Sequence, residues 1–307
     1  MEIYPSIDSF SPVSYTVFTL GVFDGVHSGH RRLITRLNQK AKEMQSSSVL
    51  LSFDPHPREV LQSGFDLKYL TTSGERIRFL KATGLQHLIF HPFTEAFSGL
   101  GSEDFVRDFL LSRLRMKHLI VGYDHHIGKG RGGSYRKLKE LSVVYGFGIE
   151  RLPAYEINNQ AISSTAIRRA LLTGELSWAN QALGYAYMIS GRVIQGDRLG
   201  RELGFPTANI EVDPKKLLPP RGVYAVRVDA RGRKYVGMLN IGVRPTLGGL
   251  DTRVVEVNLL DFREMIYDEI IYLFLIQRVR EERKFDSLKS LKAQLQNDEK
   301  TVRSFFS

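Results

Sequence analysis

The chain contains no cysteine among its 307 residues, and its apolar runs are short. Without cysteine there can be no disulfide, no thiolate metal site and no thiol nucleophile. The longest strongly apolar run, "IIYLFLI", is about a third of the roughly 20 residues that a membrane-spanning helix needs. The N-terminal "MEIYPSIDSF" lacks the basic and apolar segments of a secretory signal. We therefore expect a cytoplasmic protein without membrane attachment.

Positive charge is in excess, with a formal net charge of +10 and a pI near 9.7. This balance favours an anionic partner, such as nucleic acid, nucleotide phosphates or an acidic membrane surface. Lysine and arginine are spread along the chain, however, and form no long basic block. A basic surface that only keeps the protein in solution explains the charge equally well.

The length favours two domains, and the two halves differ in pattern. The first half alternates β-rich runs with amphipathic helical runs, which predicts a parallel sheet with helices on both faces. One helical face is expected to carry Leu33, Ile34, Leu37, Ala41 and Met44. The β-rich runs of this half are "YTVFTLGVF", "SVLLSF", "HLIF", "HLIVG" and "GIERLP".

The second half consists of short alternating runs, which predict an antiparallel barrel or sandwich. A last helical stretch, "SLKSLKAQLQNDEKTVRSFF", is expected to pack on its outside. We place the boundary between about 183 and 189, giving domains of residues 1–184 and 185–307. The six β-rich runs of this half are "MISGRVI", "TANIEV", "GVYAVRV", "YVGMLNIG", "RVVEVNLLDF" and "IIYLFLI".

Polar residues follow the strands of the first half. Ligands of a parallel sheet bind beyond the carboxyl ends of its strands. The segments at those ends are rich in histidine, aspartate and glycine: "DGVHSGH", "DPHP", "HPF" and "YDHHIGKGRGG". The sequence therefore predicts a ligand site at this edge.

The stretch "TLGVFDGVHSGHRRLI" places His27 and His30 where a strand ends and a helix begins. Unpaired N–H groups at a helix N-terminus favour phosphate, and glycine lets the backbone approach an anion closely. Two imidazoles there could donate hydrogen bonds to a phosphate and stabilise the charge of a pentacoordinate phosphorus. A structural turn and half of a metal site remain alternatives. In "ISSTAIRRAL", Ser163, Ser164 and Thr165 precede a helix that they could cap.

Two features of the second half are candidates for phosphate chemistry. The glycine-rich stretch "GRVIQGDRLGRELGFPTANI" ends in Thr207 and Asn209, whose neutral oxygens suit Mg²⁺ bound together with a nucleotide. Glu256 shares a strand face with Val254, Asn258 and Leu260 and is a candidate base. An ordinary turn and a solvent-facing glutamate are the alternatives.

"GVFDGVHSGH" resembles the H-x-G-H motif of nucleotidylyl transferases, in the form found in prokaryotic FAD synthetases, and "ISSTAIRRAL" resembles their second signature. The resemblance implies a Rossmann-like domain in which His27 and His30 are catalytic. It also implies a flavin contact at Asp124, although His125, His126 and Ile127 stand where the family usually has aromatic residues. The implied ATP contacts are Gly21, Phe23, Asp24, Gly29, Ser164, Thr165 and Arg168.

The second half resembles riboflavin kinase through "GDRLGRELGFPTANI", "LNIGVRPT", "EVNLLDF" and "RVREERKF". The resemblance implies that Glu256 is catalytic, that Thr207 and Asn209 hold Mg²⁺, and that Asn240 and Arg278 contact the flavin. Asn258 stands where the family usually has histidine. The implied ATP contacts are Gly191, Gly196, Gly200, Arg201, Thr207 and Asn209.

Together the resemblances imply a bifunctional enzyme that makes FMN from riboflavin and ATP, and then FAD and pyrophosphate from FMN and a second ATP. We expect a monomer or weak homo-oligomer that binds neither nucleic acid nor membrane. One alternative is that only the first half is active and the barrel merely binds flavin. Another is a nucleic-acid-binding barrel, for which Tyr224 and Tyr235 offer few stacking aromatics.

Overall fold

A computed structural model describes residues 1–62, 64, 66–123, 128, 133–196, 200, 203–244 and 252–306. The chain forms two compact units, Met1–Ser163 and Ser164–Ser307. This division falls before the boundary expected from the sequence, because the helix that precedes the barrel is bonded to it. The Asn180 side chain donates to the Leu275 carbonyl (2.9 Å) and accepts from the Tyr187 amide (2.7 Å).

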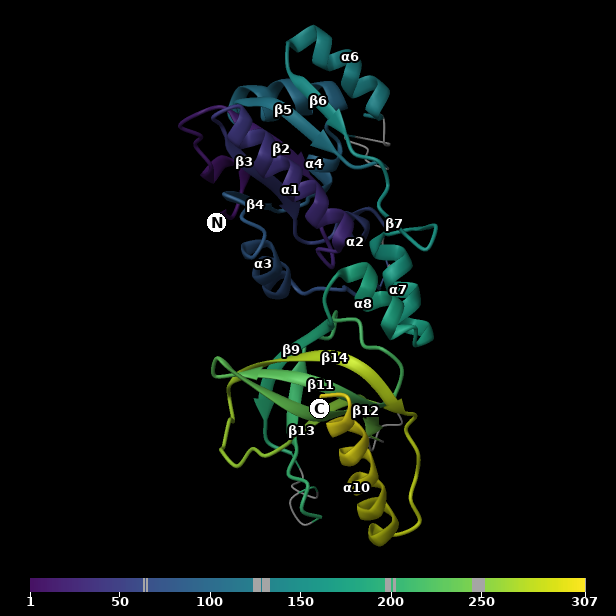
Figure 1. Cartoon of the computed structure of the whole chain (residues 1–307). Helices are drawn as coiled ribbons and strands as arrows, with labels where there is room; N and C mark the ends of the chain where they lie inside the picture. The colour runs from purple at the N-terminus through teal and green to yellow at the C-terminus, as the bar shows by residue number, and fades with distance from the viewer. Residues whose placement is uncertain are drawn as a thin grey trace. The chain divides into compact units, whose positions relative to one another are not determined.

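The first unit is built on a parallel six-stranded sheet with the order β1-β4-β3-β2-β5-β6, which confirms the predicted architecture (Figure 1). The strands are β1 (Glu2–Tyr4), β2 (Thr16–Leu20), β3 (Ser47–Phe53), β4 (His87–His91), β5 (Met116–Val121) and β6 (Gly148–Arg151), followed by a small hairpin of β7 (Glu156–Ile157) and β8 (Gln160–Ala161). The helical segments are η1 (Ile7–Ser9), α1 (Ser28–Glu43), α2 (Pro57–Leu61), α3 (Ser73–Lys81), α4 (Glu95–Ser98), α5 (Ser102–Asp104), the π-helical η2 (Phe105–Arg113) and α6 (Tyr135–Tyr145).

Adjacent residues of the central strands enter two different apolar cores. Phe18 and Leu51 belong to one core, whereas Val17 and Leu50 belong to the other. Because side chains alternate along a strand, this division shows that both faces of the sheet are covered. Of the five residues predicted on one face of α1, Leu33, Ile34, Leu37 and Ala41 are buried, whereas Met44 is exposed.

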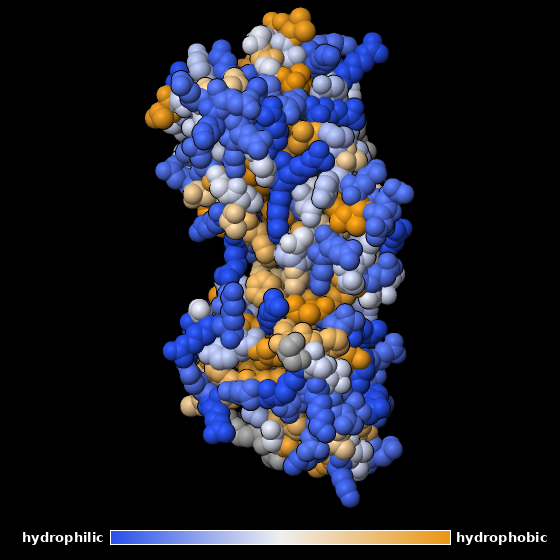
Figure 2. Space-filling model, in the orientation of Figure 1, coloured by the Kyte–Doolittle hydropathy of each residue, from blue (hydrophilic) through white to orange (hydrophobic). Residues whose placement is uncertain are grey.

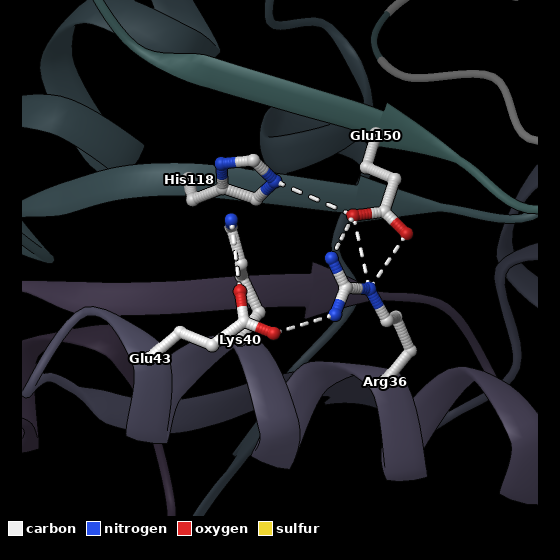
Figure 3. A network of polar contacts seen from close by, with 5 residues as sticks. All are labelled: Arg36, Lys40, Glu43, His118 and Glu150. Atoms are coloured by element: carbon white, nitrogen blue, oxygen red, sulfur yellow. Dashed lines mark hydrogen bonds and ion pairs between the residues drawn. The ribbon is translucent and has the colours of Figure 1, made fainter.

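Polar contacts tie α1 to the sheet beyond this apolar face (Figure 3). Arg36 donates from Nε and Nη2 to the Glu150 carboxylate of β6 at 2.8 to 3.1 Å, and from Nη1 to Glu43 at 2.9 Å. Lys40 pairs with the same Glu43, and His118 of β5 lies 4.0 Å from Glu150. The network fixes the helix that carries His30 in its first turn.

The second unit begins with α7 (Ser164–Thr173) and α8 (Leu176–Leu183) and continues as a closed antiparallel barrel. Its strands are β9 (Tyr187–Ile194), β10 (Ala208–Val212), β11 (Gly222–Ala230), β12 (Arg233–Arg244), β13 (Thr252–Leu259) and β14 (Ile270–Arg280). The six predicted runs thus form a barrel, in the order β10-β13-β12-β11-β14-β9. The predicted last helix, α10 (Leu288–Ser304), packs against it through Val302.

Hydrophilic residues cover most of the surface turned to the viewer in Figure 2, and apolar side chains appear there only in small patches. Among the described residues, no helix combines the length and the apolar character that crossing a bilayer requires.

Candidate functional sites

The histidine turn, residues 21–30, connects β2 to α1 and brings the two predicted imidazoles together. His27 caps the helix, and its Nδ1 accepts from the His30 amide at 3.3 Å. The two rings are stacked, with centroids 3.5 Å apart and an angle of 17° between their planes. The Phe23 ring lies 4.7 Å from that of His30. The pair therefore stands at a helix N-terminus, where an anion is favoured.

Burial controls the protonation of this pair. His27 is 5% exposed, and the Nδ1 atom of His30 is buried without a hydrogen-bond partner among the described residues. Burial first, and then electrostatic interaction with His27 and Arg76, hold the pKa of His30 well below its ordinary value of 6.5. These effects favour the neutral form of His30. Among the described residues, no group of three or more histidine, aspartate or glutamate side chains could hold a metal ion.

Backbone conformation explains one glycine of the turn, and close packing explains another. Gly25 has a φ of +82°, which glycine adopts without strain. A Cβ at Gly29 would lie 3.3 Å from the His27 ring, so any larger residue would press on it. Glycine at position 29 thus leaves the His27 imidazole the space that it occupies.

The other predicted ATP contacts of the first unit have partners within the protein. The Asp24 carboxylate accepts from the Leu70 and Thr71 amides and from the Thr71 hydroxyl, at 2.9 to 3.0 Å. Phe23 is 3% exposed, and a Cβ at Gly21 would lie 3.2 Å from its ring. Their direct contact with ATP stays a prediction.

The second signature opens α7 of the second unit. Ser164 is its first residue, Thr165 is exposed in its first turn, and Arg168 follows one turn later. Each unit is described separately, so the meeting of these residues with the histidine turn stays a prediction. The predicted flavin contact Asp124, the segment His125–Ile127 and Arg201 lie outside the described residues.

A row of polar side chains crosses three strands of the barrel. Glu256 on β13 is directly opposite Asn209 on β10 and Asn240 on β12. Directly opposed residues project to the same face of a sheet. All three side chains line a cavity of about 430 Å³, together with Thr207.

The rest of this cavity, which we call the α10 cavity, is lined largely by apolar and charged residues. Arg280 contributes to its wall and forms a 2.7 Å ion pair with Asp298, a residue of α10 that is 2% exposed. Its further lining residues are Gly200, Leu203, Phe205, Val223, Met238, Leu239, Asn258, Glu282, Arg283, Phe285, Leu291 and Leu295. An apolar chamber with a polar row on one wall suits a ring system that carries a hydroxylated chain.

The glycine-rich stretch packs tightly against the same residues. A Cβ at Gly196 would lie 1.9 Å from the Asn209 amide nitrogen, and one at Gly200 would lie 2.4 Å from the Phe205 carbonyl oxygen. Gly191 on β9 is similarly crowded by the Glu211 carbonyl oxygen (2.4 Å). These glycines admit close approach of the backbone, and their contact with ATP stays a prediction.

A second hollow of about 350 Å³, the aromatic hollow, also borders Thr207. Phe262 and Tyr267 contribute rings to it, and Met265 and Ile266 contribute apolar side chains. Thr207 therefore lines both the α10 cavity and the aromatic hollow.

Arg278, a predicted flavin contact, does not line the α10 cavity. It lines a separate hollow of about 450 Å³ with Arg221 and Arg253. A bulge in the pairing of β11 with β14 sets Arg278 opposite Tyr224 but Arg280 opposite Val223, so the two arginines lie on different faces. Arg280 lines the α10 cavity in its place.

Comparison with known proteins finds a different family model for each half of the chain. A family model described as FAD synthetase matches residues 11–166, and one described as riboflavin kinase matches residues 183–306. The chain belongs to the bifunctional riboflavin kinase/FMN adenylyltransferase family. The bifunctional riboflavin kinase/FMN adenylyltransferase of Escherichia coli K12 is 38% identical, over 97% of this chain and 95% of its own. That of Listeria monocytogenes is also 38% identical, over 94% and 92%.

Among solved structures, a Streptococcus pneumoniae crystal structure named as a macrolide-efflux protein has a TM-score of 0.90 and 30% identity, with 98% of each chain covered. This similarity extends the shared fold to nearly the whole length of the chain.

The riboflavin kinase domain contains the residues that sequence reasoning missed. Arg280, Arg283 and Phe285 lie in or beside "RVREERKF", which marks the domain but does not show which face each side chain takes. Tyr224 is 1% exposed and donates its hydroxyl to the Pro220 carbonyl, so it cannot stack on a nucleic-acid base.

Both activities of the family use ATP and imply a divalent metal. In the riboflavin kinase domain, a hydroxyl, an amide and a carboxylate oxygen donor are available from Thr207, Asn209 and Glu256 beside one cavity. Hard oxygen donors of this kind fit Mg²⁺, and glycine at position 196 leaves the Asn209 side chain the space that a Cβ would fill.

Proposed function

We propose that the two domains use the two sites described above for successive ATP-dependent reactions. The riboflavin kinase domain converts riboflavin and ATP to FMN and ADP. The FAD synthetase domain converts FMN and a second ATP to FAD and pyrophosphate. The observation that carries this assignment is the row of Asn209, Glu256 and Asn240 beside Thr207 in the α10 cavity.

In the kinase reaction, the flavin ring occupies the α10 cavity and its ribityl chain reaches toward Glu256. The aromatic hollow takes the purine of ATP, so the γ-phosphate lies near Thr207, which borders both spaces. Thr207 and Asn209 would hold Mg²⁺, which would neutralise charge on the ATP phosphates.

Glu256 orients the ribityl 5′-hydroxyl and takes its proton as the oxygen bonds to the γ-phosphorus. The bond from that phosphorus to the β–γ bridging oxygen breaks, and ADP leaves. Positioning and charge neutralisation provide most of the rate, and the general base contributes about 10²–10⁴-fold.

In the adenylyl transfer, a phosphate oxygen of FMN attacks the α-phosphorus of ATP, and the bond to the α–β bridging oxygen breaks. His27 and His30 donate hydrogen bonds to oxygens of the α-phosphate, aided by the N-terminus of α1. Ser164, Thr165 and Arg168 hold the triphosphate, and Arg168 supplies the charge-assisted bonds. Pyrophosphate leaves without a covalent enzyme intermediate.

Separate loss of the two products tests this assignment. Glu256→Gln should lower FMN formation from riboflavin by at least about 10²-fold, because it removes the base. It should leave FAD formation from added FMN unchanged. His30→Ala should do the reverse, so that FMN accumulates. Chromatography of the flavin products with Mg²⁺ and ATP measures both reactions.

The matched controls are Glu211→Gln, an exposed glutamate of β10, and His87→Ala at the amino end of β4, the opposite end of that strand from the ligand edge. Neither control should change either reaction. If Glu256→Gln or His30→Ala removed both activities from a folded chain, the assignment of one reaction to each site would be wrong.

We infer further that the protein acts in the cytoplasm as a monomer or weak homo-oligomer, since each proposed kinase component lies within one chain. Sedimentation at micromolar concentration measures the oligomeric state.

A further inference from the structure

The histidine turn has a strained backbone. Phe23 and Val26 have φ angles of +56° and +35°, in a region that residues with a side chain rarely adopt. Such strain persists only where the surroundings impose it. Because His27 follows Val26 directly, whatever imposes this conformation also places the imidazoles.

The segment just before α3 fixes the turn through hydrogen bonds. The Asp24 carboxylate accepts from the backbone amides of Leu70 (3.0 Å) and Thr71 (2.9 Å). The Thr71 hydroxyl donates to Asp24 (3.0 Å) and accepts from the amide of Gly25 (2.9 Å). The middle of the turn is therefore bonded at four points to two consecutive residues.

Arg76, in the first half of α3, also fixes the turn. Its side chain is 1% exposed. Its Nη1 donates to the carbonyl of Val22 in the turn at 2.8 Å. The same nitrogen donates to the Ser52 hydroxyl and the Phe53 carbonyl, both at 3.2 Å. Arg76 thus joins the start of the histidine turn to the carboxyl end of β3, the strand paired with β2.

Secondary contacts lock this arrangement. The Ser52 hydroxyl donates to the same Val22 carbonyl at 2.9 Å, and the Arg76 guanidinium lies 4.9 Å from the centre of the Phe90 ring. Burying a guanidinium costs free energy unless its N–H groups find hydrogen-bond acceptors. Here the acceptors are the Val22 carbonyl in the histidine turn and two groups at the carboxyl end of β3.

Arg76 also acts on His30 electrostatically. Burial, His27 and Arg76, in that order, lower the pKa of His30. Burial lowers the pKa of Arg76 itself, while Asp24, Asp54 and Tyr69 raise it. The positive charge of Arg76 therefore helps to keep the His30 imidazole neutral.

We propose that Arg76 is a positioning residue for adenylyl transfer, which acts with Asp24 and Thr71 to hold the histidine turn in the strained conformation that stacks His27 on His30. The inference rests on the proposed function of this turn. Arg76 itself, being buried, acts through the turn and touches no substrate.

The test compares three variants in the full-length chain. Arg76→Met keeps most of the side-chain volume but removes the charge and the donors. It should lower kcat for FAD formation from FMN by about 10²-fold, the effect of a misplacement near 1 Å, with a KM for ATP changed by less than about threefold. Arg76→Lys keeps the charge with one donor group, and its kcat should lie between those of the parent and of Arg76→Met. Arg78→Met, an exposed arginine of the same helix, should change neither value.

Two further measurements separate positioning from general destabilisation. FMN formation by the barrel should be unchanged in every variant. The pKa of His30, followed by imidazole NMR in the free protein, should rise in Arg76→Met and stay low in Arg76→Lys. Loss of fold alone would not give this difference between the two substitutions.

The proposal is overturned if folded Arg76→Met retains kcat within about threefold of the parent, or if its His30 pKa does not move. Should Arg76→Met fail to fold, Arg76→Lys and Thr71→Val decide: both must lower kcat for FAD formation by at least about fivefold while FMN formation persists. His30→Ala in the same assay distinguishes failure of the proposed function from failure of this inference. If it retains FAD formation, the proposed function of the turn is wrong, whereas loss in His30→Ala with retention in Arg76→Met overturns only this inference.

Discussion

Asn258 lies two residues from Glu256 on β13, and its amide donates to the Pro206 carbonyl at 2.7 Å. It is 7% exposed and borders the α10 cavity. Pro206 directly precedes Thr207, so this bond fixes the backbone from which the proposed metal-binding hydroxyl projects. The asparagine at this position therefore holds the loop that carries Thr207.

We expect Asn258→Leu to raise the KM for ATP in FMN formation by about tenfold, since it removes the partly buried hydrogen bond that holds the Thr207 loop. FAD formation from FMN should be unaffected. Initial rates at varied ATP measure the effect, with exposed Asn297→Leu on α10 as the matched control. An unchanged KM for ATP would show that the bond does not position the loop.

Individual residues were predictable where a motif and a strand end coincide, and less so where burial or a bulge decides. The closeness of His27 and His30 follows from their spacing at the start of a helix, whereas the placement of Glu256 opposite Asn209 depends on strand register. Arg278 and Arg280, two apart, should share a face, but the bulge in β14 separates them. Arg76 looked like any arginine of an amphipathic helix, because its acceptors come from distant strands.

At the scale of elements, α1 depends on polar as well as apolar contacts. Its Arg36 joins Glu150 of β6, and both side chains are less than a third exposed. Partial burial and the two-pronged geometry make this pair more effective than a fully exposed one.

Glu150→Gln should therefore speed amide hydrogen exchange in the last two turns of α1 by about two- to fivefold. The exchange of α3 should not change. The pKa of His118, already lowered mainly by burial, should fall further, because Glu150 favours its charged form. Mass-resolved exchange tests the first effect and NMR titration the second. Glu140→Gln, in an exposed pair with Arg136 on α6, is the control, and equal exchange in both variants would contradict the role of Arg36–Glu150.

Most elements were predictable because their periodicity is long and regular. β1 was missed, since Glu2–Tyr4 has only three residues and pairs with β4, far along the chain. The sequence could not separate a barrel from a sandwich, because closure depends on the pairing of β10 with β9. Nor does local pattern show that α8 is bonded to the barrel through Asn180.

For the whole molecule, the two proposed sites in one chain should allow one variant to supply what another lacks. An equimolar mixture of Glu256→Gln and His30→Ala should convert riboflavin to FAD, although neither variant does so alone. The first keeps the adenylyl transfer and the second keeps the kinase, and FMN passes between them through solution.

A time course of the mixture should show FMN rising before FAD, with a lag that shortens at higher protein concentration. A chain with both substitutions should make neither product. If the mixture gave FMN but no FAD, while Glu256→Gln still used added FMN, the intermediate would not be exchanged freely between molecules.

The position of Thr207 on the border of the α10 cavity and the aromatic hollow has a consequence for the whole kinase domain. In the proposed arrangement, the Thr207 side chain borders the space of each reactant. Shortening this side chain would alter the walls of both spaces at once. In the proposed arrangement, one substitution at this position would therefore disturb the binding of both reactants.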